Sequence, residues 1–256
     1  MKNEIFSVGP FTVHGYGLMI AIGVLAAYTA AVKRAKKYNL NAELIFDLAL
    51  WCLAGGILGA KILYWVTIFP EILSDPASLL KDFSNGFVVY GGILGGILGG
   101  YLFCRRKKIL FLQYFDLVMP SVALAQGFGR IGCFLAGCCY GAETDGWFHV
   151  VFHDSSMAPN HIPLLPTQLI SSALDFAHFF ILAWFASRKK ADGQVAGLYL
   201  ILYSIGRFIL EFFRGDLIRG SVGTLSTSQF ISIFILAAGL AVFFGLAAVS
   251  GRKNAA

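Results

Sequence analysis

Long apolar stretches, each near twenty residues, recur along the chain between short polar segments. Seven can be marked, at residues 16–32, 44–69, 86–104, 109–135, 167–186, 195–213 and 230–249. A helix needs about 20 apolar residues to cross the ~30 Å hydrocarbon core of a bilayer. With 57% hydrophobic and only 13% charged residues, the chain is typical of an integral membrane protein. The sequence therefore predicts an all-α fold of seven transmembrane helices, forming one transmembrane domain over residues 1–256.

Basic residues gather after the first, third, fifth and seventh apolar stretches, in the segments KRAKK, CRRKK, SRKK and GRKN. Lys and Arg are in excess on the cytoplasmic side of membrane proteins. We therefore expect the N-terminus outside, the C-terminus in the cytoplasm, and residues 141–166 as an extracytoplasmic loop between the fourth and fifth spans. The clusters account for most of the net charge of +6, so no nucleic-acid partner is predicted.

Charged residues within the apolar stretches predict a binding site. Arg207, Glu211 and Arg214 recur at i, i+4 and i+7 and so share one helix face. Charges at bilayer depth usually face a bundle interior or a substrate path. Counting 1.5 Å per residue from the cytoplasmic ends places Arg207 at roughly 20 Å, Lys61 at roughly 26 Å and Arg130 at roughly 30 Å, all in the outer half. A guanidinium group can donate two parallel hydrogen bonds to two oxygens of one phosphate. These cations therefore predict a pocket for an outer-leaflet phospholipid.

Glycine repeats in AGGILGAK and YGGILGGILGG predict that two helix backbones touch. Such packing would hold Lys61 and Tyr90 rigidly near the outer surface. For Tyr90, a hydrogen bond to a phosphate or thiol and a role as an interface anchor are both open. Asp175 and His178, at i and i+3, favour a hydrogen bond between helices over a proton relay.

A cysteine-rich segment, QGFGRIGCFLAGCCYG, combines Arg130 with five glycines, and we expect the helix to break into a loop near Gly137. It contains three cysteines, Cys133, Cys138 and Cys139. A zinc site that also uses His149 or His153, and an extracytoplasmic redox pair, are both open. However, neighbouring cysteines chelate poorly and form strained disulfides. Small packing side chains are the favoured interpretation, so neither a metal nor a cofactor is predicted.

The motifs of the chain resemble those of the bacterial prolipoprotein diacylglyceryl transferases. GRIGCFLAGCCYG is similar to the family signature GRxGNFxNxExxG. Further segments resemble family motifs in the same order, namely HGYGLMI, GAKILYW, YGGILGG, LLPTQL and YSIGRFILEFFRGD. The resemblance covers nearly the whole chain and implies a multi-pass protein of the bacterial plasma (inner) membrane. It also implies transfer of the diacylglyceryl group of phosphatidylglycerol to the lipobox cysteine of an exported preprolipoprotein, with a thioether and glycerol phosphate as products.

The matched motifs also suggest which residues act. We expect catalytic roles for Arg130, Arg207, Tyr90 and Glu211, and substrate binding by Tyr16, Lys61, Gly141, Tyr203, Arg214 and Gln168. The chain departs from the family pattern at several positions, among which Tyr90 replaces a histidine, Cys133 an asparagine, Cys138 a glutamate and Ile170 a tyrosine.

These departures leave two other functions open. One is a transferase that uses phosphatidylglycerol with a different acceptor. The other is a small-molecule transporter, although the chain shows no convincing internal repeat of the kind common in transporters. We expect a monomer.

Overall fold

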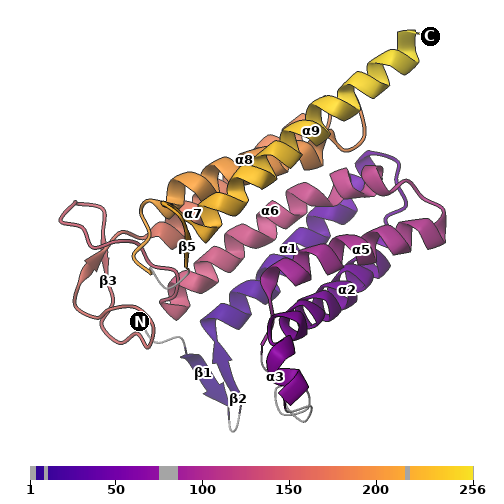
Figure 1. The fold of residues 1–256 in the computed structure, drawn as a ribbon. Coiled ribbons are helices and arrows are strands. Elements are labelled where there is room, and N and C mark those ends of the chain that lie inside the picture. The colour runs from indigo at the N-terminus through magenta and orange to yellow at the C-terminus, as the bar shows by residue number, and fades with distance from the viewer. Residues whose placement is uncertain (1–3, 9–10, 75–85, 217–219, 256) are drawn as a thin grey trace. The chain divides into compact units, whose positions relative to one another are not determined.

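A computed structural model describes residues 4–8, 11–74, 86–216 and 220–255. The chain packs as two compact units, one formed by residues 1–34 with 115–256 and the other by residues 35–114. Figure 1 follows the chain from indigo to yellow. The helices are α1 (Gly15–Lys37), α2 (Leu44–Thr67), α3 (Phe69–Ser74), α5 (Val89–Lys107), α6 (Phe111–Ala136), α7 (Thr167–Phe185), α8 (Gln194–Glu211) and α9 (Thr227–Ala255).

The surface of the helices is apolar, the reverse of a soluble protein. Leu25, Leu58 and Leu94 are 66%, 63% and 66% exposed, whereas the polar Gln168 and Ser204 are 1% exposed. Six helices in the described parts of the chain are long and apolar enough to cross a membrane: α1, α2, α6, α7, α8 and the Thr227–Leu246 part of α9. The predicted helical, multi-pass architecture is therefore confirmed at this level.

The remaining predicted span corresponds to α5, which is long enough with 19 residues but is not among the helices apolar enough to cross a membrane. Six of its 19 residues are glycines and three of its last four are basic, and glycine adds little apolar surface. Six of the seven predicted spans are thus supported by helices that are long and apolar enough to cross a membrane.

The fold is mostly helical and agrees with the predicted all-α class, and short antiparallel strand pairs occur beside the helices. They are β1 (Glu4–Val8) with β2 (Phe11–His14), β3 (Val150–Val151) with β4 (Pro163–Leu164), and β5 (Ser221–Val222) with β6 (Leu225–Ser226). Most of these strands have only two residues. Such a strand is too short to show the alternating pattern by which a strand is recognised in a sequence.

In the second unit, α2 and α5 are in backbone contact through glycines, as predicted. A Cβ atom added to Gly95 would lie 2.2 Å from the carbonyl oxygen of Gly55, and one added to Gly91 would lie 2.3 Å from that of Gly59. Real Cβ atoms do not approach backbone this closely, so these positions need glycine.

In the first unit, glycines and a buried carboxylate set the helix packing. Gly197 of α8 lies against the backbone of Phe243 in α9. Near the start of α6, the carboxylate of Asp116 accepts hydrogen bonds from the backbone N–H groups of Gly193 (2.8 Å) and Ala196 (3.0 Å). It also accepts one from Lys189 Nζ (2.9 Å). Asp116 therefore satisfies donors at the first turn of α8 and fixes this helix against α6.

Candidate active site

The signature segment leaves α6 through a tight turn. Gly137 has φ +74°, and the N–H of Cys138 donates to the carbonyl of Cys133 at 3.1 Å. A left-handed glycine followed by such a bond is a common way to end a helix. The expected break near Gly137 is confirmed.

The loop that follows pairs with the chain just beyond α8. The N–H of Ala142 donates to the carbonyl of Phe213 (2.9 Å), and the N–H of Gly215 donates to that of Tyr140 (3.1 Å). Between them, Gly141 donates to the carbonyl of Leu165 (3.0 Å), and a Cβ atom on Gly141 would lie 2.4 Å from that oxygen. Gly141 thus permits a close approach of three backbone segments, which brings the signature loop beside Arg214.

The first turn of α7 also holds this loop. Gln168 Nε2 donates to the carbonyl of Cys138 (2.9 Å), and Thr167 Oγ1 donates to that of Cys139 (3.0 Å). Gln168, a predicted substrate ligand, therefore binds the loop backbone through its amide nitrogen. Its Oε1 atom is buried and has no hydrogen-bond partner among the described residues.

The predicted charged stripe forms an ion-pair network. Arg207 Nη1 lies 2.7 Å from Glu211 Oε2, and Arg214 Nε lies 4.0 Å from the same oxygen. Arg207 Nη2 also donates to Ser228 of α9 at 2.7 Å. Asp216 accepts two hydrogen bonds from Arg214, at 2.7 and 2.6 Å. Sequence reasoning missed Asp216, although its position two residues after Arg214 was a usable signal.

A small pocket lies between α6, α7 and α8. Its lining consists of Arg130, Ser171, Leu174, Asp175, His178, Tyr203, Gly206, Arg207 and Leu210. Arg130 of α6 and both Arg207 and Tyr203 of α8, all predicted site residues, thus line one pocket. Arg207 and Arg130 present positive charge to the same small space, which suits an anion such as a phosphate.

Asp175 and His178 also line this pocket, and they were left out of the predicted site. His178 Nδ1 lies 3.9 Å from Asp175 Oδ1, too far for a hydrogen bond. His178 Nδ1 is buried without a hydrogen-bond partner in the described parts of the chain, so the favoured interpretation, a bond between helices, finds no support at this atom. The usable signal was a pair of titratable groups on one face of an apolar helix.

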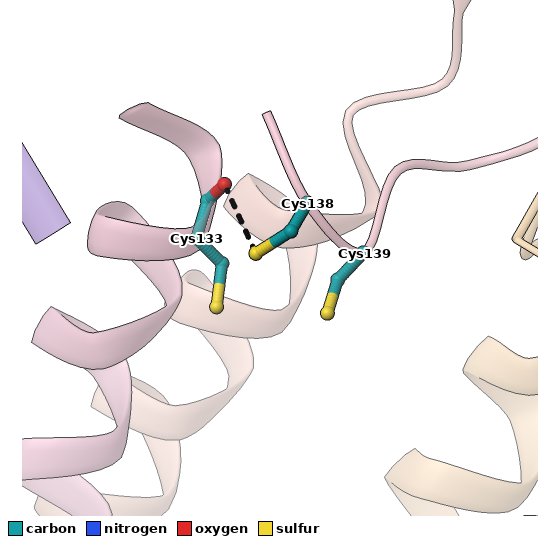
Figure 2. A group of neighbouring side chains, drawn as sticks. All are labelled: Cys133, Cys138 and Cys139. Carbon is teal, nitrogen blue, oxygen red and sulfur yellow. Dashed lines mark hydrogen bonds between the residues drawn. The ribbon is translucent and has the colours of Figure 1, made fainter. Parts of the chain in front are cut away.

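Three cysteines gather where α6 ends (Figure 2). The sulfur atoms of Cys133, Cys138 and Cys139 all lie within 4.8 Å of one another. Hydrogen bonds from the Cys133 and Cys138 thiols, with the nearby Arg214 guanidinium, lower the pKa of the Cys139 thiol below its ordinary value. The bonds of Cys138 to the other two thiols, together with burial, raise its pKa. Tyr16 of α1 lies within electrostatic range of all three.

Two predicted site residues belong to the second unit. Lys61 is 6% exposed, and its Nζ lies over the rings of Tyr64 (5.0 Å) and Phe87 (5.1 Å). Both distances are those of a cation–π contact. Tyr90, at the start of α5, is 43% exposed. The roles of both residues stay predictions.

Comparison with known proteins identifies the family. The family model described as prolipoprotein diacylglyceryl transferase matches residues 3–245. The chain belongs to this family. Similar relatives include the phosphatidylglycerol–prolipoprotein diacylglyceryl transferase of Clostridium tetani, which is 49% identical over 95% of this chain and 97% of its own. The second such transferase of Clostridium perfringens is 46% identical over 98% and 96%. That of Finegoldia magna is 33% identical over 94% of each chain.

Membership of the transferase family confirms the resemblance found in the motifs. The match includes the signature segment, Tyr16 and the stripe at Arg207. The variant cysteines therefore lie within a diacylglyceryl transferase sequence that matches along nearly its whole length, and a transporter is not supported.

Proposed function

We propose that this protein transfers the diacylglyceryl group of phosphatidylglycerol to the lipobox cysteine of a preprolipoprotein, forming a thioether and releasing glycerol phosphate. The names of the clostridial relatives give phosphatidylglycerol and prolipoprotein as their substrates. The observation that carries the proposal is the convergence of Arg130 and Arg207 on one pocket between three largely apolar helices. No cofactor is needed for the displacement itself.

The reaction requires the pocket to stabilise the leaving phosphate and to remove the proton of the acceptor thiol. The acceptor sulfur attacks a glycerol carbon, the bond from that carbon to the phosphate oxygen breaks, and glycerol phosphate leaves with the electron pair. We assign the stabilisation of this developing charge to Arg130 and Arg207, because both line the pocket. Glu211 lies beside the Nη1 atom of Arg207, and Ser228 accepts a hydrogen bond from its Nη2 atom, so these two residues orient the guanidinium. Arg214 is held by Asp216, and we assign it to positioning the loop and Glu211.

The second requirement is removal of the thiol proton. A cysteine with a pKa of ~8.5 is only a few per cent thiolate at neutral pH. Asp175 and His178 are the carboxylate and imidazole that line the pocket together with the two arginines. Positioned acid–base groups typically contribute 10²–10⁴-fold to rate. We therefore assign proton transfer to this pair, with Tyr203 and Tyr16 as substrate contacts.

Changing His178 to asparagine should lower turnover at least tenfold, equivalent to ~1.4 kcal/mol, because the pocket loses its imidazole. The measurement is single-turnover transfer at saturating phosphatidylglycerol. A matched control is His161→Asn, in the exposed His153–His161 pair of the loop, which should leave the rate unchanged. Equal rates for wild type and His178→Asn would remove the imidazole from the mechanism.

The reaction itself is tested with purified protein, phosphatidylglycerol and a lipobox peptide. The peptide should gain the mass of one diacylglyceryl group, and a peptide with serine in place of cysteine should gain none. If a relative is active under the same conditions and this protein yields no product, the acceptor is wrong and other thiols should be screened.

We also propose seven spans in one transmembrane domain over residues 1–256, with α5 as the third span. The N-terminus then lies outside, residues 141–166 form an extracytoplasmic loop, and the protein resides as a monomer in the plasma membrane. The four basic clusters and the packing of α5 along α2 support this arrangement.

Cysteine labelling tests this topology. Cys104 is only 1% exposed and makes a poor probe, whereas Trp147 is 91% and Leu110 is 66% exposed. In a background without native cysteines, Trp147→Cys should react with an impermeant thiol reagent in intact cells. Leu110→Cys, beside the CRRKK cluster, should react only after permeabilisation. The opposite pattern would invert the topology.

A further inference from the structure

The three-cysteine group has the geometry of a metal site. A tetrahedral zinc ion with Zn–S distances of ~2.3 Å needs sulfur atoms roughly 3.8 Å apart. The sulfur atoms of Cys133, Cys138 and Cys139 already lie within 4.8 Å of one another. Figure 2 shows one side chain coming from the last turns of α6 and two from the loop, with the sulfurs gathered at the break.

The backbone explains how two neighbouring cysteines can serve one ion. Cys139 adopts φ +60°, a left-handed conformation that is rare for residues other than glycine. With the main chain in this conformation, the Cys139 sulfur lies within 4.8 Å of those of Cys133 and Cys138. The carbonyls of Cys138 and Cys139 are held by Gln168 and Thr167. These two bonds fix the main chain of the loop without using a sulfur atom, as expected of a preorganised ligand set, while the Cys138 thiol also donates to the Cys133 carbonyl at 3.7 Å (Figure 2).

Charge and ligand number indicate which ion fits. Thiolate ligands favour zinc and other soft ions over magnesium or calcium. Three thiolates and one Zn²⁺ carry a net charge of −1, and Arg214 lies close enough to Cys139 to interact with it. Among the described residues, the potential metal ligands that gather at this point are these three cysteines, with no His, Asp or Glu in the group. Structural zinc sites use four protein ligands, whereas a site with three keeps one position open.

The group also lies beside the proposed phosphate pocket. Arg130 lines that pocket and interacts electrostatically with Cys133. On the other side, Arg214 neighbours both Cys139 and Glu211, the partner of Arg207. The cysteine group and the phosphate pocket are therefore linked through Arg130 and through the chain of Arg214, Glu211 and Arg207.

We propose that Cys133, Cys138 and Cys139 bind one zinc ion whose open fourth position takes the acceptor thiol. The assignment of the fourth position to the acceptor thiol rests on the proposed function. On binding, the acceptor thiol gives up its proton to the acid–base groups of the pocket and becomes a zinc-bound thiolate. Its sulfur then attacks the glycerol carbon, and the carbon–oxygen bond to phosphate breaks. The thioether product is neutral and a weaker ligand, so it leaves the ion.

Metal binding is tested on the whole protein, purified in detergent under reducing conditions without donor lipid. After incubation with Zn²⁺ and desalting, wild type should hold about one zinc per chain, and a Cys133→Ser/Cys138→Ser/Cys139→Ser variant roughly none. Cys52→Ser/Cys104→Ser is the matched control, since both cysteines lie in the second unit, and it should bind like wild type. Equal zinc in the triple variant, or a disulfide within the group in place of zinc, would overturn the site.

Cobalt as a zinc substitute gives a readout that does not depend on activity. Co²⁺ in wild type should show sulfur-to-cobalt charge-transfer absorption, and Cys139→Ser, which keeps the backbone bonds of the loop, should lose about a third of it because one of three sulfur ligands is gone. A lipobox peptide should raise the wild-type absorption, and the serine peptide should not. Absorption that ignores the cysteine peptide would overturn the acceptor position.

The two proposals fail separately. Undiminished transfer by metal-stripped protein would remove zinc from the reaction and leave the proposed function standing. Zinc bound at one per chain, with no transfer to any lipobox peptide, would keep the site and overturn the proposed function.

Discussion

Replacing Arg130 or Arg207 with alanine should lower kcat/KM for diacylglyceryl transfer by at least a hundredfold. Both side chains line the pocket, and loss of one preorganised charge at a developing anion typically costs ~3 kcal/mol. Lysine at either position should restore only part of the rate, because an ammonium group cannot form the two parallel bonds of a guanidinium group. The measurement is the initial rate of diacylglyceryl addition to a lipobox peptide.

The matched control is Arg188→Ala. Arg188 belongs to the same unit as Arg130 and Arg207, but it follows the C-terminal end of α7. Its guanidinium lies 4.2 Å from the centre of the Trp184 ring. This variant should transfer at the wild-type rate and report any general cost of removing an arginine. If Arg130→Ala and Arg207→Ala were as active as Arg188→Ala, the phosphate pocket would have to be placed elsewhere.

Changing Gly95 to alanine should markedly destabilise the protein, because the new Cβ atom would meet the Gly55 carbonyl oxygen at 2.2 Å. The obstacle is backbone, so α2 and α5 must move apart. Overpacking of this kind costs about 1–3 kcal/mol or more, and we expect the Tm to fall by roughly 5 °C or more. The measurement is thermal unfolding in detergent.

The next residue along α5 provides the control. A Cβ atom on Gly96 would lie 3.4 Å from the Cys52 carbonyl oxygen, close to an ordinary contact. Gly96→Ala should therefore leave the Tm within a degree or two of wild type, or raise it slightly, because alanine favours helix. Similar Tm values for the two variants would mean that α2 and α5 are not in backbone contact.

The sequence predicted those features that depend on local chemistry. Periodicity placed Arg207, Glu211 and Arg214 on one face, and they do form one ion-pair network. Glycine spacing predicted the contact of α2 with α5, and glycine density predicted the break at Gly137. Each of these signals lies within a few turns of one helix, where side-chain direction follows directly from residue number.

Features that depend on tertiary contact were missed. Asp175 and His178 gain their meaning from the arginines of α6 and α8, which are distant along the chain. The cysteines were interpreted as packing residues because adjacent cysteines chelate poorly, and the left-handed turn at Cys139 that changes this cannot be read from its residue type. Strand pairs of two residues, such as β3 with β4, carry no periodic signal.

The way the signature loop is fastened bears on how this family can diverge. Backbone bonds from Ala142 and Gly215, together with the Gln168 and Thr167 side chains, hold the loop. None of them uses a side chain of Cys133, Cys138 or Cys139. Substitutions of similar size at these three positions can therefore change the chemistry of the loop while the bonds that carry it past Arg214 are kept.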